Sequence, residues 1–308
     1  QESFQLSFLA NVYEPLVGRG RDFKLTPMLA TRWEQTAPTV WRFHLRQGVT
    51  FQDGTPFTAD DVLFSYERTR SESSDTKLYV APVKEVRKID DHTIEMVTRD
   101  PFPILPDLVS GWLIMSKAWS EKNQSQAPTD VRKGKENFAS THANGTGPFM
   151  LDSRQPGVRT VLKANPGWWG KKEHNLDEVI FTPIANDATR VAALISGEID
   201  LMEPVPLQDI QRIESNPKLK VLQAPELRTM YLGLDVGRDE LLFSNIKGKN
   251  PLKNVRVRRA LYQAIDIETI RSKVMRGAAQ PAGLPVAPGV RGYDPALDKR
   301  VTYEPTDA

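Results

Sequence analysis

The chain has 308 residues, enough for about two domains at roughly 150 residues each, and its 41 basic and 39 acidic side chains leave a formal net charge of only +2. This near-balance excludes the basic excess typical of nucleic-acid-binding proteins, and a hydrophobic content of 39% excludes a disordered chain. No cysteine is present, which excludes disulfides, thiolate metal sites and a cysteine nucleophile, and no apolar run is long enough to predict a membrane-spanning helix.

The N-terminal segment has apolar residues at helical spacing, with Phe4, Phe8 and Val12 four positions apart. This spacing predicts a helix that Pro15 ends, because proline and the residue before it disfavour a continuing helix. Residues 39–46 alternate between apolar and polar side chains, the period of a half-buried strand.

The next elements are predicted from turn and cap residues. Asp53-Gly54 forms a turn, and Thr58 with Asp61 forms a capping box that begins a helix running to about Thr69. Two alternating segments within 83–98, joined by an Asp-Asp pair, predict a β-hairpin. The first half therefore looks like a mixed α+β structure with locally connected strands, and between 120 and 140 we expect only a short helix.

Caps also mark the predicted helices of the second half. They are a helix begun by Asn186 or Asp187 and ended by Gly197, a helix over 207–213 closed by Asn216-Pro217, a helix from Asn254 to 265, and a helix from Asp266 to Gly277. Between them, residues 228–235 alternate, with Met230, Leu232 and Leu234 on one face and Thr229, Tyr231 and Asp235 on the other. Short helices around such a strand suggest βα units and an α/β fold.

No catalytic constellation is found. The four histidines are widely separated, so they offer no metal-ligand spacing; they are His44, His92, His142 and His174. The carboxylate pairs Asp60-Asp61 and Asp90-Asp91 are explained by a helix cap and a hairpin turn. A hydrolase that uses paired carboxylates is therefore disfavoured, and we predict neither a metal nor a cofactor.

Two further features have alternative readings. The basic stretch Lys253 to Arg259 fits the solvated face of an amphipathic helix better than a phosphate site. Trp168 and Trp169 follow an Asn-Pro-Gly turn, and they could stack on a sugar or a base or anchor the core after the loop.

Several segments together resemble the family 5 extracellular solute-binding proteins, the peptide, nickel and related receptors of ABC importers. The resemblance is collinear and spread over nearly the whole chain. It is carried by YEPL (13–16), residues 27–68, GTGPFML (145–151), ANPGWWGKKEHNLDEVIF (164–181), ALISGEIDLM (193–202) and NVRVRRALYQAID (254–266).

The resemblance implies a periplasmic-binding-protein-like fold of two lobes that close around a ligand by a hinge. Residues 1–32 with 146–250 would form a discontinuous first lobe, 33–145 a smaller inserted domain, and 251–308 the start of the second lobe. Family members are considerably longer, so most of the second lobe is expected to lie outside this chain. A cleft wall and the helices over 254–265 and 267–276 would then be left uncovered, and we expect the 308-residue chain to self-associate or to pack these helices against a neighbouring molecule.

The resemblance also implies a ligand site. Tyr13, Glu14, Pro15 and Leu16 would approach the ligand, near the polar face formed by Thr229, Tyr231 and Asp235. Many relatives have Asn at the position of Asp235, so a carboxylate there would favour a ligand amine or simply bond the backbone.

The function implied is that of a non-enzymatic receptor that delivers a short peptide to membrane permease subunits. The full-length protein would be a monomer in the periplasm, exported by a signal peptide that this chain does not include, and no nucleic acid is expected as partner. A nickel complex, an oligosaccharide or an opine are the alternative ligands, and the ligand-binding module of a sensor or regulator is the alternative class.

Overall fold

The computed structural model describes residues 8–130 and 134–306, and it forms two compact units, residues 1–183 and residues 184–308. The finer division into a discontinuous lobe one, an insert over 33–145 and a second lobe from 251 stays a prediction. The helix predicted from Phe4 lies largely outside the described residues. None of the described helices has the length and hydropathy needed to cross a bilayer.

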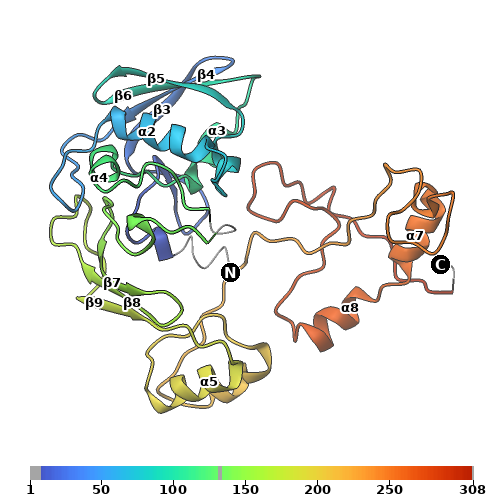
Figure 1. Cartoon of the computed structure of the whole chain (residues 1–308). Helices are drawn as coiled ribbons and strands as arrows, with labels where there is room; N and C mark the ends of the chain where they lie inside the picture. Colours follow the sequence, from blue (N-terminus) through green and yellow to red (C-terminus); the bar gives the residue numbers. More distant parts are fainter. Residues whose placement is uncertain (1–7, 131–133, 307–308) are drawn as a thin grey trace. The chain divides into compact units, whose positions relative to one another are not determined.

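Unit 1 is built from antiparallel strands and short helices (Figure 1). Its strands are β1 (Val17–Arg19), β2 (Leu25–Pro27), β3 (Ala30–Ala37), β4 (Val40–Leu45), β5 (Val83–Asp90), β6 (Thr93–Thr98), β7 (Phe149–Gln155), β8 (Arg159–Ala164) and β9 (Glu178–Phe181). Its α-helices are α2 (Ala59–Arg70), α3 (Leu105–Leu108) and α4 (Lys117–Lys122), with single-turn helices at Lys77–Val80, Val109–Gly111 and Phe138–Ser140.

The largest sheet has the order β3-β4-β6-β5, and α2 packs along one of its faces (Figure 1). The predicted alternation of 39–46 is confirmed, since Phe43 and Leu45 are buried on the side of the core. The hairpin predicted over 83–98 is also confirmed, as β5 and β6 pair in antiparallel register around the Asp-Asp turn. Burial of such apolar faces supplies the main favourable free energy of folding.

The capping box of α2 is confirmed atom by atom. The Thr58 hydroxyl oxygen accepts from the backbone N–H of Asp60, and the Thr58 N–H donates to Asp61 Oδ2 at 2.9 Å. The other oxygen, Asp61 Oδ1, accepts from the N–H of Lys117 at 2.9 Å, so the cap also fixes the start of α4. Burial is the main influence on this carboxyl and raises the pKa of Asp61.

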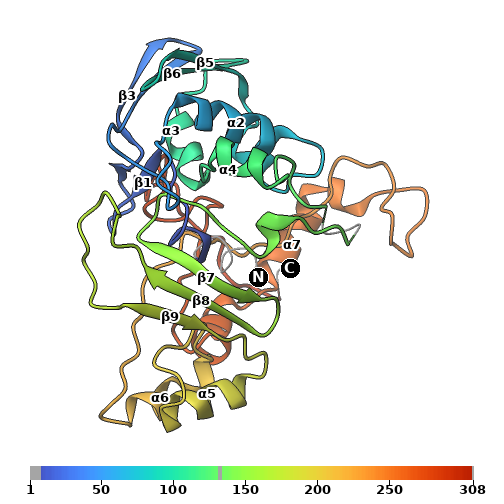
Figure 2. The same cartoon turned by 60° about the vertical axis from the view of Figure 1, so that its left-hand side comes forward.

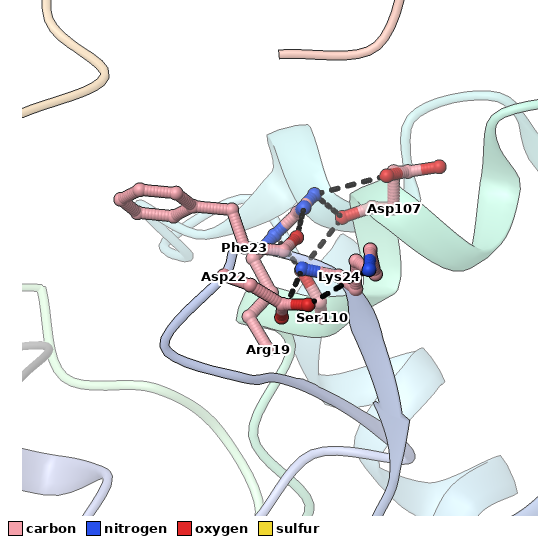
Figure 3. Close-up of polar contacts among 6 residues, drawn as sticks. All are labelled: Arg19, Asp22, Phe23, Lys24, Asp107 and Ser110. Atoms are coloured by element: carbon pink, nitrogen blue, oxygen red, sulfur yellow. Dashed lines mark hydrogen bonds and ion pairs between the residues drawn. The ribbon is translucent and has the colours of Figure 1, made fainter. Parts of the chain in front are cut away.

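A polar cluster joins the β1–β2 hairpin to α3 and to the single helical turn that follows it (Figure 3). The Arg19 guanidinium donates to Asp107 Oδ1 at 3.1 Å, to Ser110 Oγ at 3.2 Å and to the Phe23 carbonyl at 3.0 Å. Phe23 has a φ of 61°, a left-handed conformation that is unusual for a bulky residue. The hydrogen bond to its carbonyl helps to hold this conformation, and its ring points away from the polar cluster (Figure 3).

The strands β7, β8 and β9 form a second antiparallel sheet in which β7 is an edge strand (Figure 2). The beginning of β7 is fixed to the N-terminal segment, because the N–H of Phe149 donates to the carbonyl of Asn11 at 3.0 Å. Buried Phe149 and Leu162 pack with Val12 and Tyr13 in a core of their own. The sheet therefore holds Asn11 and Val12 together with Tyr13, the first residue of the predicted ligand segment.

Unit 2 has helices but no strands in its described part, and the predicted caps of its helices are confirmed. Its α-helices are α5 (Asp187–Ser196), α6 (Ile210–Glu214), α7 (Val255–Gln263) and α8 (Ile267–Thr269), the last continued by a π-helical turn over Ile270–Val274. Asn186 accepts from the N–H of Thr189 at 2.9 Å, Gly197 ends α5 with a φ of 80°, and Asn254 caps α7. The helix predicted to run to Gly277 is thus shorter and less regular than expected.

The strand predicted over 228–235 is wrong. In the described residues this segment pairs with no strand, and both of its faces are open to solvent, with Met230 86% and Tyr231 77% exposed. A β-strand needs a hydrogen-bonded neighbour, and alternation alone does not supply one. The βα units expected in this half are wrong for the same reason, because every strand pair described is antiparallel and lies in unit 1.

Candidate functional site

The segment Tyr13–Leu16, predicted to approach a ligand, is buried in unit 1. Its backbone is held on two sides: the Glu14 carbonyl accepts from the N–H of Ile114 at 3.0 Å, and the Leu16 carbonyl accepts from the N–H of Ala30 at 2.8 Å. The segment therefore lies between two other parts of unit 1 as a fixed piece of the core.

The carboxylate of Glu14 is enclosed by donors from distant parts of the sequence. Its Oε2 accepts from the indole Nε1 of Trp169 at 2.7 Å and from the hydroxyl of Thr146 at 2.8 Å, and its Oε1 accepts from the indole Nε1 of Trp168 at 3.0 Å. Only 1% of the Glu14 residue is exposed. We call Glu14, Thr146, Trp168, Trp169 and Arg46 the Glu14 cluster.

Burial dominates the electrostatics of this carboxyl and raises the pKa of Glu14, although the three hydrogen bonds and the charge of Arg46 act in the opposite direction. Arg46 reaches the cluster through the Trp169 ring, since its guanidinium carbon lies 4.2 Å from the ring centroid. Its Nε donates to the Met28 carbonyl at 3.0 Å, which fixes the arginine in place.

The raised pKa of Glu14 predicts a pH dependence that Glu14→Gln removes. The folded state holds the Glu14 proton more tightly than the unfolded state, so this contribution to stability is complete below the unfolded pKa of about 4.3 and is lost as the pH rises through the folded pKa. Wild type should therefore lose this contribution between pH 4 and pH 7, whereas Glu14→Gln, which does not titrate, should not. The difference in unfolding free energy between the two proteins should shift in favour of the variant as the pH rises. Urea denaturation of both proteins across this range measures the difference, and a constant or opposite difference contradicts the prediction.

The two tryptophans are anchors of this carboxylate. Of the two readings, the structure supports the core anchor for Trp169, which packs against the main hydrophobic core, and the indole N–H groups of both tryptophans donate to Glu14. The turn before them is fixed by the N–H of Gly167, which donates to Asn165 Oδ1 at 3.0 Å. Sequence reasoning missed their pairing with Glu14, for which the only signal was a carboxylate inside a largely apolar segment.

The Gly-Thr-Gly motif is shaped by close contact between backbones. A Cβ at Gly145 would lie 1.8 Å from the Val12 carbonyl oxygen, and one at Gly147 would lie 2.7 Å from the Asn11 carbonyl oxygen. Only glycine fits such an approach. The motif thereby brings Thr146 to Glu14.

Tyr13 lies beside this motif in the small core around β7. Burial raises the pKa of the Tyr13 phenol to about 12, in spite of a hydrogen bond with the backbone of Asn144 and the nearby charge of Arg68. The phenol therefore stays protonated at neutral pH. Pro15 and Leu16 continue the buried segment, and the Pro15 carbonyl accepts from the N–H of Leu29 at 3.2 Å.

The remaining predicted residues, Thr229, Tyr231 and Asp235, belong to unit 2. Thr229 and Asp235 are half-buried and Tyr231 is exposed. Asp235 Oδ1 accepts from the N–H groups of Gly237 at 3.0 Å and Arg238 at 3.2 Å, and the carboxylate forms an ion pair with Arg238 that lowers its pKa. The predicted meeting of these residues with Tyr13–Leu16 at one ligand stays a prediction.

No group of three or more acidic or histidine side chains is placed to hold a metal ion in the part of the chain that the structure describes. Glu14 is the most buried carboxylate of the predicted site, and both of its oxygens are already used by protein donors. The arrangement is therefore suited to holding a loop in place and offers no free acid or base at Glu14.

The sequence profile of the bacterial extracellular solute-binding proteins, family 5, matches residues 24–308. The chain belongs to this family. The family binds solutes and is not a family of enzymes, as the sequence predicted.

Relatives and solved structures agree with the family. The dipeptide-binding protein of Escherichia coli is 29% identical over 96% of this chain, and the glutathione-binding protein GsiB of Shigella flexneri is 26% identical over 95%. The periplasmic binding protein DppA of Helicobacter pylori, solved with the peptide STSA, superposes with a TM-score of 0.77 at 27% identity and covers 97% of this chain. The match spans 56% of the Escherichia coli protein, 55% of GsiB and 59% of the DppA chain, so the chain spans about half the length of these relatives.

These matches confirm the mixed α/β periplasmic-binding-protein fold expected from the sequence. About half of that fold is represented, since the family 5 chains that match are longer.

Proposed function

We propose that the protein to which this chain belongs is a periplasmic receptor that captures a short peptide and delivers it to the membrane permease of an ABC-type importer. The observation that carries the proposal is the family match over residues 24–308, together with relatives named for dipeptide binding and solved with a peptide. Such a receptor acts as a soluble monomer, closes around its ligand by a hinge and needs no nucleic acid or cofactor.

The ligand residues that we propose are those predicted from the sequence. Tyr13, Pro15 and Leu16 form part of one rigid side of the proposed ligand site. Glu14 holds this side in place through its hydrogen bonds with Trp168 and Trp169. Thr229, Tyr231 and Asp235 supply a second, more exposed set of groups. A carboxylate at Asp235 would suit the amino group of a peptide.

Mass spectrometry of the ligand released from denatured full-length protein tests the proposal. A short peptide supports it, whereas a nickel complex, an oligosaccharide or an opine overturns the peptide assignment. If nothing is released, calorimetric titration with di- to pentapeptides decides: binding without hydrolysis supports the proposal, and hydrolysis or the absence of binding overturns it.

Two variants in unit 2 test the proposed ligand residues. Tyr231→Ala and Asp235→Asn should each weaken peptide binding about tenfold, equal to about 1.4 kcal/mol, and leave the melting temperature unchanged. Tyr231 is exposed, so its truncation opens no cavity, and Asn at 235 keeps the oxygen that accepts from Gly237 and Arg238. Tyr303→Ala removes another partly exposed tyrosine as a control. Equal affinities of wild type and both variants contradict the assignment.

A further inference from the structure

A cavity in unit 1 is lined by none of the residues of the Glu14 cluster. Its volume is about 520 Å³, within the range of roughly 300–1,000 Å³ typical of small-molecule sites. One wall comes from α4 and the segment 138–143, and another comes from β7. The solute site proposed above uses no residue of this cavity.

The first wall is a row of aromatic rings. The centroids of Trp119 and Phe138 lie 5.6 Å apart, and the rings of Phe138 and His142 are stacked at 3.8 Å with an angle of only 8° between their planes. His142 Nδ1 lies 3.2 Å from the Phe138 carbonyl oxygen and 3.0 Å from the Thr141 hydroxyl oxygen, and these two polar contacts hold the ring in orientation. Phe138 is nevertheless 41% exposed, so a large flat apolar surface is fixed in place and open to the cavity.

The second wall carries a positive charge. Arg154 donates through Nη1 to the Ser140 carbonyl at 2.6 Å, and no carboxylate among the described residues forms an ion pair with it. Asp152, the acidic residue of this wall, is paired with Lys163 at 2.7 Å. The guanidinium of Arg154 is therefore the uncompensated charge at the cavity.

The backbone of this wall is irregular at the same place. The register between β7 and β8 shifts between Leu151 and Ser153, which is a β-bulge in an edge strand. Such bulges redirect side chains and occur often beside functional sites. The bulge changes the alternation of side chains immediately before Arg154.

We propose that this cavity binds a small aromatic carboxylate. The flat ring of the ligand packs against the exposed surface of Phe138 in the row of rings, since offset aromatic packing is favourable. The carboxylate of the ligand accepts hydrogen bonds from the free N–H groups of Arg154, which suit a planar anion with two oxygens. A ring joined to a carboxylate thus matches both walls.

Benzoate is a suitable probe, with benzamide as its neutral analogue, and binding to the 308-residue chain is measured by ligand-observed NMR titration. Wild type should bind benzoate at least about tenfold more tightly than benzamide, since a charge-assisted hydrogen bond contributes roughly this factor. Arg154→Gln should remove the preference. Arg159→Gln, which removes an exposed arginine from the neighbouring strand β8, should keep it.

A ring variant tests the other half of the site. Phe138→Ala should weaken benzoate binding several-fold without changing the preference for benzoate over benzamide, because Arg154 is kept. The proposal is overturned if wild type does not bind benzoate, if it binds both probes equally, or if Arg159→Gln lowers the preference as much as Arg154→Gln does.

Discussion

Replacing Glu14 with alanine is expected to lower the free energy of unfolding of unit 1 by about 3–5 kcal/mol. The substitution leaves the indole N–H groups of Trp168 and Trp169 and the hydroxyl of Thr146 without their acceptor. Each unsatisfied donor costs about 1–3 kcal/mol when it is buried, and the lost side chain also leaves a cavity. Guanidinium denaturation followed by near-ultraviolet circular dichroism measures this loss.

Two companion variants separate the hydrogen bonds from the charge. Glu14→Gln keeps the size of the side chain and one carbonyl oxygen, which can accept from at most two donors, so its cost should be clearly smaller. Glu173→Ala removes an exposed carboxylate close in sequence to the tryptophans and should change stability by less than about 0.5 kcal/mol. If Glu14→Ala is as stable as Glu173→Ala, the Glu14 cluster does not hold the fold together.

The features predicted correctly from the sequence are those that local chemistry decides. Thr58 and Asp61 lie within one turn of each other, so their capping box could be read from residue types and spacing alone. The same holds for Asn186 at the start of α5 and Gly197 at its end. Each of these bonds closes within a few residues, and tertiary contacts are not needed to specify it.

The Glu14 cluster could not be predicted in the same way. Glu14 and Trp169 are 155 positions apart, and neither residue type specifies the other. The strand predicted over 228–235 was wrong for a related reason. The alternation of its residues indicates which face a strand would bury, but it does not identify a partner strand. Local patterns therefore predicted helices and hairpins, the family resemblance predicted the fold class, and the long-range pairings came only from the structure.

The segment 228–236 is expected to join two copies of the 308-residue chain into a dimer. The apolar side chains of Met230, Leu232 and Val236 are exposed to solvent. The segment belongs to no sheet in the described residues. An exposed extended segment of this kind is a template for pairing with another chain. Of the possible occupants, a second copy fits because the segment can pair with itself in register.

An antiparallel pair centred on Leu232 keeps Met230, Leu232 and Leu234 of both copies on one face. In this register Met230 of one copy lies opposite Leu234 of the other, and Leu232 lies opposite Leu232, so the apolar face is continuous across the dimer. On the opposite face, Tyr231 lies across from Gly233, where an aromatic ring can cover the backbone that glycine leaves exposed. A shift by one residue would place apolar side chains opposite polar ones.

Sedimentation equilibrium of the 308-residue chain should therefore show a dimer whose fraction rises with concentration, and Leu232→Asp should convert it to a monomer. The two introduced aspartates would face each other at the centre of the pair, and like charges directly opposite are destabilising. Leu176→Asp changes another exposed leucine, in unit 1, and should leave the dimer intact. A wild-type chain that stays monomeric at all concentrations, or a dimer that survives Leu232→Asp, excludes this pairing, since every contact in it depends on the register at Leu232.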